Sequence, residues 1–239
     1  MTALINPFWY AVATDPYFAS VVLLMHFDGA NGTNTFVDSS LYNHIFSASA
    51  SGITHTTAQQ KFGSACLQNT LAGAFAATSD SADWYFAAGQ FTIEAWIRPT
   101  ATVVNFPLIV AQFGSGGTQA WGVRFNGNAA PGFFDFMYSQ NGSTLSFVSA
   151  AYLPAVNTWT HIAVDRDASN VLRIYADGVV LNSATVTATI FNSTNGLTIA
   201  NDSLGASGFI GQIDDLRITK GVARYAGAFT PPTAAFPNL

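Results

Sequence analysis

The sequence is short of charge, and of basic residues in particular. Only 9% of its 239 residues are Asp, Glu, Lys or Arg, with 8 basic against 13 acidic side chains and a formal net charge of −5. The basic residues are spread thinly from Lys61 to Arg224, so they form no basic patch that could neutralise nucleic-acid phosphates or anionic lipid headgroups. We therefore expect no nucleic acid and no membrane surface as a partner.

Cysteine and long hydrophobic runs are also scarce. The single cysteine, Cys66, excludes an intramolecular disulfide, and its apolar neighbours predict a small buried side chain rather than a nucleophile. The apolar run 21–25 is far too short to span a bilayer. No Lys or Arg precedes Lys61, so the basic region of a secretory signal is missing. These features predict a protein made in the cytoplasm without a signal peptide.

Apolar and aromatic residues are plentiful. Hydrophobic residues make up 49% of the chain and aromatic residues 14%, including 20 Phe. A single all-β domain can reach roughly 200 to 250 residues, so we expect one main domain with one sizeable core.

The apolar pattern is that of strands. Helical spacing is nearly absent, whereas residues 91–98 alternate, with Phe91, Ile93, Ala95 and Ile97 on one face and Glu94, Trp96 and Arg98 on the other. Asn141-Gly142 and Asp177-Gly178 predict hairpin turns between further alternating segments. The parity of apolar residues changes at Asp214-Asp215, which predicts a β-bulge. Many short strands separated by turns predict an antiparallel β-sandwich.

Both ends of the chain differ from its middle. Residues 1–20 are aromatic but not periodic, and residues 21–239 end in a Pro-rich tail that should be extended. We expect two extended arms, the first of which attaches to a neighbour or a second copy, because crowded aromatic residues usually mark an interface. The alternative is that residues 1–20 pack on their own sandwich. The proposed attachment residues are Phe8, Trp9, Tyr10, Tyr17 and Phe18.

Several segments, taken in order, resemble a known family. They are 23–29 (LLMHFDG), 38–40 (DSS), 43–44 (NH), 61–63 (KFG), 91–99 (FTIEAWIRP), 159–164 (WTHIAV) and 174–178 (IYADG). Over residues 22–220 the chain resembles the laminin-G-like branch of the concanavalin A-like lectin/glucanase superfamily. The C-terminal segments 209–225 (FIGQIDDLRITKGVARY) and 229–232 (FTPP) resemble the version in virion proteins of tailed bacteriophages and prophages.

The resemblance implies a jelly-roll sandwich of two antiparallel sheets. It also implies a non-enzymatic component of the virion surface, either a capsid decoration or a tail protein, with other virion proteins as partners. The main alternative is a free-standing carbohydrate-binding lectin domain. A glycoside hydrolase is a third hypothesis.

The residues offer little for hydrolysis. Glycosidases need two carboxylates about 5 to 9.5 Å apart, and Glu94 is the only Glu in the chain. Asp165 and Asp167 have the spacing of one strand face, but the residues after Asp167 are typical of a turn. We therefore predict no enzyme.

A calcium ion has more support. The loop that contains Asp38 and Asn43 concentrates side-chain and carbonyl oxygens, which are the ligands that Ca²⁺ prefers. Family members often carry such an ion on the rim, and Asp28 or Asp214 could complete its shell. The equal alternative is that Asp38 and Asn43 cap turns.

Glycan binding needs exposed aromatic faces beside polar groups, because sugars present apolar CH patches ringed by hydroxyls. The candidates are Trp84, Trp121, Arg124 and Asn126. Each aromatic is also what a sandwich core or its rim would contain, and for any single one the core is the favoured interpretation.

Overall fold

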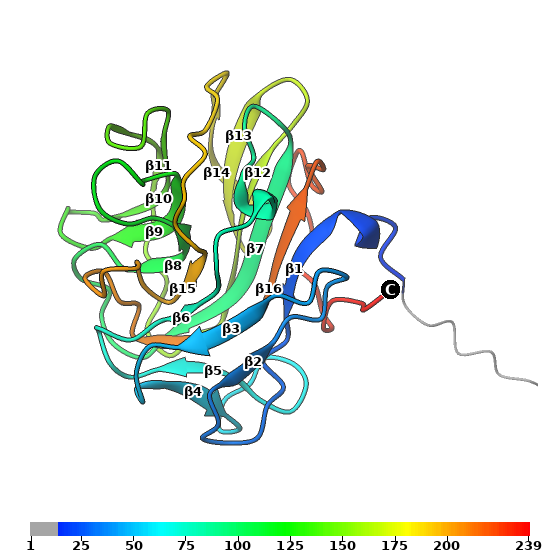
Figure 1. Cartoon of the computed structure of the whole chain (residues 1–239), viewed down its shortest axis with the longest axis vertical. Helices are drawn as coiled ribbons and strands as arrows, with labels where there is room; N and C mark the ends of the chain where they lie inside the picture. Colours follow the sequence, from blue (N-terminus) through cyan, green and yellow to red (C-terminus); the bar gives the residue numbers. More distant parts are fainter. Residues whose placement is uncertain (1–13) are drawn as a thin grey trace, which may run out of the picture.

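The computed structural model describes residues 14–239, which form two antiparallel sheets packed face to face as a sandwich (Figure 1). Besides the strands, this part of the chain has two 3-10 helices, η1 (Phe18–Ser20) and η2 (Ala82–Trp84). Neither helix has the length and hydrophobicity needed to cross a membrane. The predicted all-β jelly-roll sandwich is confirmed.

The first sheet, called sheet A, has β7 and β16 at its centre. Strand β16 pairs with β7 along one edge, and with β1 and β5 along the two halves of its other edge. In spatial order the strands are β14 (Val179–Thr185), β13 (Val171–Ala176), β12 (Thr160–Arg166), β7 (Phe91–Pro99), β16 (Gly211–Lys220), β5 (Cys66–Asn69) and β4 (Ile53–Thr56), with β1 (Val21–Met25) beside β16.

The second sheet, called sheet B, packs against the inner face of sheet A. Its strands follow the order β11 (Leu145–Ala151), β10 (Phe133–Ser139), β9 (Trp121–Asn126), β8 (Leu108–Gln112), β15 (Thr198–Ile199), β6 (Ala76–Ala77), β3 (Ile45–Ala48) and β2 (Thr35–Val37). The hairpin predicted around Asn141-Gly142 is confirmed as β10 and β11, paired from Phe133–Ala151 to Ser139–Leu145.

Two local predictions about the backbone are also confirmed. Strands β13 and β14 are joined by Asp177 and Gly178, whose φ angles of 46° and 77° are those of a type I′ turn. In β16 the register shifts between Asp214 and Arg217, where Asp215 has a φ of 48°. This bulge lets Ile213, an odd position, and Leu216, an even one, both enter the core.

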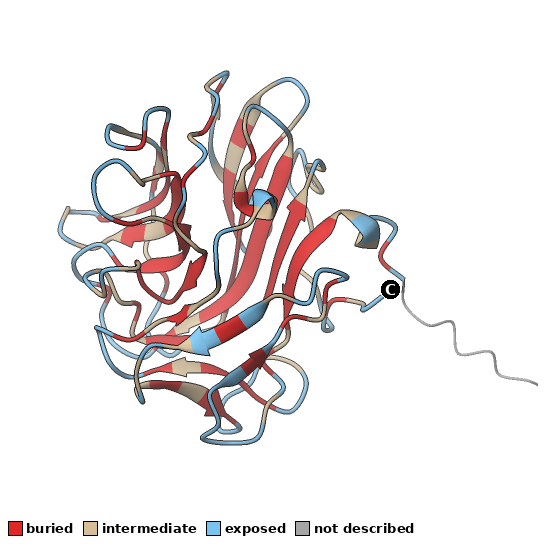
Figure 2. Ribbon diagram, viewed as in Figure 1, coloured by how far each residue is buried: buried red, intermediate tan, exposed pale blue. Residues whose placement is uncertain are grey.

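The core lies between the two sheets. Figure 2 shows that buried residues follow the strands and exposed residues the connecting loops. The predicted inward face of β7, with Phe91, Ile93, Ala95 and Ile97, belongs to this core. Its other face is buried as well, because Glu94 and Trp96 are covered from outside the sandwich.

Lys61 and Phe62 cover Trp96, and the end of the chain covers Glu94. Residues 221–239, here called the C-terminal strap, contain neither helix nor strand and lie over the outer face of sheet A (red in Figure 1). The backbone N–H of Ala226 donates to Asp165 at 2.7 Å, that of Phe229 to the carbonyl of Gly178 at 2.9 Å, and that of Phe236 to Asp215 at 2.7 Å. These bonds hold the strap along its length.

The start of the described chain packs against the same face. The N–H of Asp15 donates to the carbonyl oxygen of Leu239 at 2.7 Å, and Phe18 packs against a cluster of Val21, Leu24 and Phe236. Asp15 and Phe18 therefore contact the sandwich, and the arm boundary at residue 20 stays a prediction.

The proposed attachment residues separate into three groups. Phe18 is in intramolecular contact, whereas Tyr17 is 45% exposed beside the Arg224 guanidinium. Phe8, Trp9 and Tyr10 lie outside the described residues.

Candidate functional site

A row of polar side chains crosses the outer face of sheet B. Alternation along β9, β10 and β11 turns Phe125, Phe134 and Val148 into the core and their neighbours outward. Register then places Arg124 opposite Asp135, and Asp135 opposite Ser149. Two strand spacings separate the ends of this polar row, which is about 10 Å.

Apolar side chains flank the polar row on both sides. Met137 and Phe147 pair on one side, and Phe133 lies opposite Asn126 on the other. Together these residues form an open hollow of about 430 Å³, here called the sheet B depression. Its lining residues are Arg124, Asn126, Phe133, Asp135, Phe147 and Ser149.

Arg124 is fixed in place by three neighbours. Its guanidinium carbon lies 4.9 Å from the centre of the Phe106 ring and 4.6 Å from that of Phe147. Its Nε–H donates to Oδ2 of Asp135 at 3.1 Å. Because both rings remain about 40% exposed, the site presents aromatic faces and an oriented guanidinium to solvent.

The floor of this face depends on a glycine. A Cβ added at Gly122 would lie 2.6 Å from Cε of Met137 and 2.8 Å from Cδ2 of Leu108. Without that side chain, Met137 and Leu108 form a buried apolar cluster with Ala111 on the outer side of the sheet. This cluster supports the strands that carry Arg124 and Asp135.

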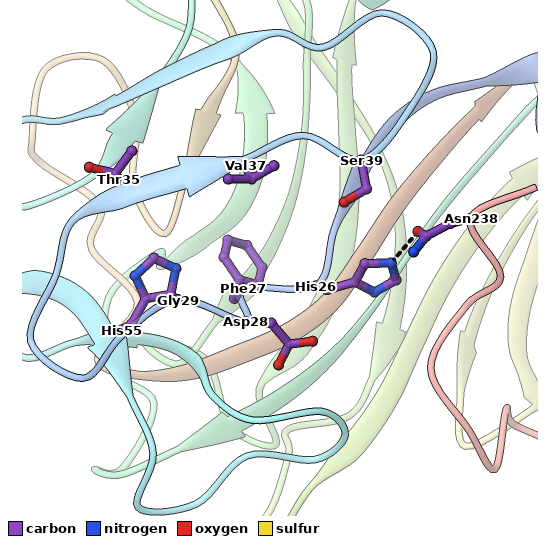
Figure 3. A pocket seen from close by; sticks show the side chains of 9 residues that line it. All are labelled: His26, Phe27, Asp28, Gly29, Thr35, Val37, Ser39, His55 and Asn238. Carbon is purple, nitrogen blue, oxygen red and sulfur yellow. Dashed lines mark hydrogen bonds between the residues drawn. The ribbon is translucent and has the colours of Figure 1, made fainter.

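A second cleft lies at the rim, where β1 leaves sheet A (Figure 3). Its volume is about 320 Å³, and its lining residues are His26, Phe27, Asp28, Gly29, Thr35, Val37, Ser39, His55 and Asn238. The one phenylalanine there is buried, so this rim cleft offers polar groups without an aromatic platform. It suits sugar binding less well than the sheet B depression does.

The pKa values of the two histidines in the rim cleft are shifted in opposite directions. Burial opposes protonation of His26, but its Nδ1 lies 2.5 Å from Oδ1 of Asp215 and its Nε2 2.7 Å from Oδ1 of Asn238, so its pKa is raised. Burial lowers the pKa of His55. Through its contact with Asn238, the His26 ring helps to hold the end of the C-terminal strap.

The predicted metal ligands are not brought together. The described residues contain no cluster of three or more His, Cys, Asp or Glu side chains arranged for a metal ion. Asp28 accepts hydrogen bonds from Ser64 and Ala65, and Asp214 accepts them from the backbone of Lys61 and Phe62. Both carboxylates are therefore engaged in hydrogen bonds that join loops to strands.

Asp38 and Asn43 behave as turn residues. The Asp38 carboxylate accepts the N–H groups of Leu24, Ser40 and His44, and it also contacts the ring of His44 at 2.8 Å. Asn43 has a φ of 50° and bonds locally to the carbonyl of Leu41. The loop therefore does not fit a calcium shell in this arrangement.

Calcium binding by this protein stays a prediction. It would be supported by a melting temperature that falls when EDTA is added and recovers with Ca²⁺, because an ion bound only by the folded state stabilises it.

The glycan candidates divide in two. Trp84 and Trp121 are fully buried, with the Trp121 Nε1–H donating to the carbonyl of Trp84 at 2.8 Å. Neither indole can stack on a sugar, so this part of the prediction is wrong; a large indole close to an alternating strand serves the core. Arg124 and Asn126 do line the surface depression.

Sequence reasoning did not identify Asp135, Phe147 and Ser149. Their signal was present in the predicted hairpin, since alternation places all three on the face opposite Phe134 and Phe136. What was missing is the pairing of β10 with β9, which brings Arg124 to the same row.

Of the carboxylates considered for hydrolysis, Glu94 and Asp165 lie beneath the C-terminal strap, whereas Asp167 lies in the turn between β12 and β13. Burial alone would raise the pKa of Glu94, but the positive charge of Arg217 lowers it to about 2. Asp165 accepts from the hydroxyl of Tyr175 at 3.0 Å, and Asp167 caps the predicted turn through the N–H groups of Ser169 and Val171. All three carboxylates thus have structural partners.

Two solved structures with a similar fold are binding domains of toxins. The binding domain of Paraclostridial mosquitocidal protein 1 superposes with a TM-score of 0.65 at 12% identity, over 87% of this chain and 50% of that one. The binding domain of botulinum neurotoxin DC in complex with SialylT gives 0.62 at 16% identity, over 86% and 49%. This chain therefore spans about half the length of those two.

A third structure matches over nearly its whole length. Domain 4 of AbnA, a GH43 extracellular arabinanase from Geobacillus stearothermophilus in complex with arabinotriose, superposes with a TM-score of 0.62 at 15% identity, covering 84% of this chain and 93% of that one. At such low sequence identities, these superpositions show that the folds are alike and nothing more.

Sequence comparison identifies the family. No curated protein matches the chain. The Laminin_G_3 family model, described as the concanavalin A-like lectin/glucanases superfamily, matches residues 71–224, which is more than half of the chain. Those residues include β6 to β16, and with them the whole sheet B depression. The chain belongs to the concanavalin A-like lectin/glucanase superfamily.

Proposed function

We propose that this protein is a non-enzymatic, lectin-like module that binds carbohydrate in the sheet B depression. The observation that carries the proposal is the polar row Arg124–Asp135–Ser149 lying between apolar rows that include the exposed ring of Phe147. A sugar ring has the same division, with hydroxyls at its edge and CH groups on its faces. Ligand-bound structures of fold relatives, with arabinotriose and SialylT, support this choice.

Phe147→Ala tests the proposal directly. We expect the wild-type protein to bind one class of oligosaccharide on a glycan array and the variant to lose at least tenfold in affinity, because the stacking platform is removed and Arg124 loses one of its two rings. Isothermal titration with the best array ligand would measure the loss.

Tyr42→Ala is the matched control. Tyr42 is 46% exposed, close to the 44% of Phe147, and it lies between β2 and β3 at the opposite edge of sheet B from β11. We expect it to bind as the wild type does. Equal loss in both variants, or no saturable binding by the wild type, would contradict the proposed site.

The virion is our proposal for where this module works. Support comes from the resemblance of residues 209–225 and 229–232 to virion proteins of tailed phages. On this proposal the protein sits on the particle surface as a capsid decoration or tail component, with other virion proteins or further copies of itself as partners. Capsid or tail genes beside its coding sequence, and antibody labelling of intact particles, would test the placement.

A further inference from the structure

We infer that the sheet B depression selects neutral sugars and grips a pair of adjacent hydroxyls between Arg124 and Asp135, rather than the carboxylate of an acidic sugar. This inference rests on the proposed function, because it names the class of ligand for the same site. It comes from the charge balance and the unused hydrogen-bonding groups of the polar row.

The charges in the depression cancel. The Arg124 guanidinium is paired with the Asp135 carboxylate at 3.1 Å, and the other lining residues, Asn126, Phe133, Phe147 and Ser149, are uncharged. A sugar carboxylate that approached Arg124 would also approach Asp135, whose negative charge is buried in the same row. A neutral ligand meets no such repulsion.

The remaining hydrogen-bonding groups match a diol. Arg124 uses only Nε on Asp135, and its two terminal nitrogens have no acceptor among residues 14–239. Oδ2 of Asp135 accepts that bond, while nothing in the same part of the chain donates to Oδ1. One hydroxyl can therefore donate to Asp135 while its neighbour on the ring accepts from Arg124.

The aromatic rings make this geometry a fixed one. Phe106 and Phe147 both contact the Arg124 guanidinium, and the cross-strand pairing with Asp135 sets its direction. Exposed Phe147 lies next to the row and can receive the CH face of a sugar held there. Little side-chain freedom is then lost on binding.

Paired sugars that differ only at C6 provide the test. Each glucoside would be compared with the matching glucuronide, and each galactoside with the matching galacturonide. Their affinities would be measured by titration into the wild type and into Asp135→Asn. We expect the wild type to prefer the neutral member of a pair by about tenfold or more. Asp135→Asn removes the negative charge with little change in shape, so its preference should move toward the acidic member.

Each outcome has its own meaning. A wild type that prefers the acidic member, or an Asp135→Asn variant with an unchanged ratio, overturns the inference while leaving carbohydrate binding in place. A wild type that binds neither member of any pair, nor any glycan on the array, overturns the proposed function itself. If Asp135→Asn does not fold, the wild-type ratio alone decides, because repulsion by Asp135 predicts its direction.

Discussion

Five ionisable side chains, two of them from the C-terminal strap itself, meet where the strap closes the outer face of sheet A. Arg217 donates to Glu94 at 2.7 Å and to Asp15 at 3.0 Å, and Arg224 reaches the same Asp15 at 2.7 Å. The hydroxyl of Tyr225 completes the group on Glu94. Buried charges cost several kcal/mol each unless they are paired, and here every charge has a partner. Removing one of these side chains should therefore destabilise the fold by more than the energy of the contact that it makes, because a buried charge is left without its partner.

Asp214, unlike those paired charges, is a carboxyl whose pKa is raised by burial, and this gives a pH prediction. Burial raises its pKa to about 7 from 3.8. Between those pH values Asp214 holds a proton in the folded protein that it has released in the unfolded chain. Its contribution to the free energy of unfolding is therefore full below pH 3.8 and is lost as the pH rises through 7. In Asp214→Asn the loss should vanish, leaving the variant more stable than the wild type at pH 8 by on the order of a few kcal/mol. Urea unfolding from pH 4 to 8 measures it.

Asp167→Asn is the control for that series. Slight burial raises the pKa of Asp167, but its hydrogen bonds with Arg173 and nearby N–H groups lower it overall. A carboxyl with a lowered pKa does not cause a loss of stability toward pH 8, so the variant should keep the wild-type decline. An Asp214→Asn profile parallel to that of the wild type would show that Asp214 is ionised in the folded protein throughout.

At the scale of elements, the strands and the extended Pro-rich tail were readable in the sequence, whereas the contacts of the strap were not. The face of β7, the hairpins at Asn141-Gly142 and Asp177-Gly178, and the bulge at Asp214 all follow from local alternation and turn chemistry. The pairing of β7 with β16 joins segments more than a hundred residues apart, which no local pattern encodes. The strap has no periodicity at all, so its contacts could not be foreseen.

The contact between the strap and the β13–β14 turn can be tested at one glycine. Gly178 has a φ of 77°, and a Cβ there would overlap the carbonyl of Phe229 in the strap. We expect Gly178→Ala to lose about 1 kcal/mol from backbone strain and roughly a further 1 to 3 kcal/mol from overlap with the strap. Denaturant unfolding measures the total.

Gly32→Ala separates the two costs. Gly32 has nearly the same φ, 79°, but a Cβ there would meet no atom within 4 Å. It should show the strain alone. Equal losses in the two variants would mean that the strap moves aside at no cost and does not stabilise the sandwich at this turn.

At the scale of the whole molecule, the sandwich begins earlier in the chain than its strands do. Asp15 is buried between Arg217 and Arg224, and Phe18 packs on Phe236. The candidate site also emerged only at this scale. Arg124 and Asn126 were recognisable from sequence as polar neighbours of aromatics, but which aromatics stay exposed depends on how the two sheets pack.

Two truncations test where the domain starts. Removal of residues 1–18 should lower the melting temperature relative to removal of residues 1–13, because Arg217 and Arg224 lose a buried counter-charge and Phe236 loses a neighbour. A difference on the order of 10 °C is expected in thermal unfolding. Identical melting curves would show that residues 14–18 add nothing to the fold.

The same pair of proteins tests the attachment prediction. If Phe8, Trp9 and Tyr10 mediate self-association, both truncations should be monomers in sedimentation experiments while the full chain assembles. Assembly that persists without residues 1–13 would rule out those three side chains as the anchors.

The bond between Asp15 and Leu239 holds the start of the described chain and the C-terminus on one side of the molecule. That side is the strap face of sheet A, and the sheet B depression opens on the opposite side of the sandwich. A partner joined to either end, whether a longer polypeptide or an assembly, would therefore lie on the strap side. The sheet B depression would then face away from that partner. Multiple copies on one support would then direct their depressions toward the same target surface, and weak individual contacts would combine into tight adhesion.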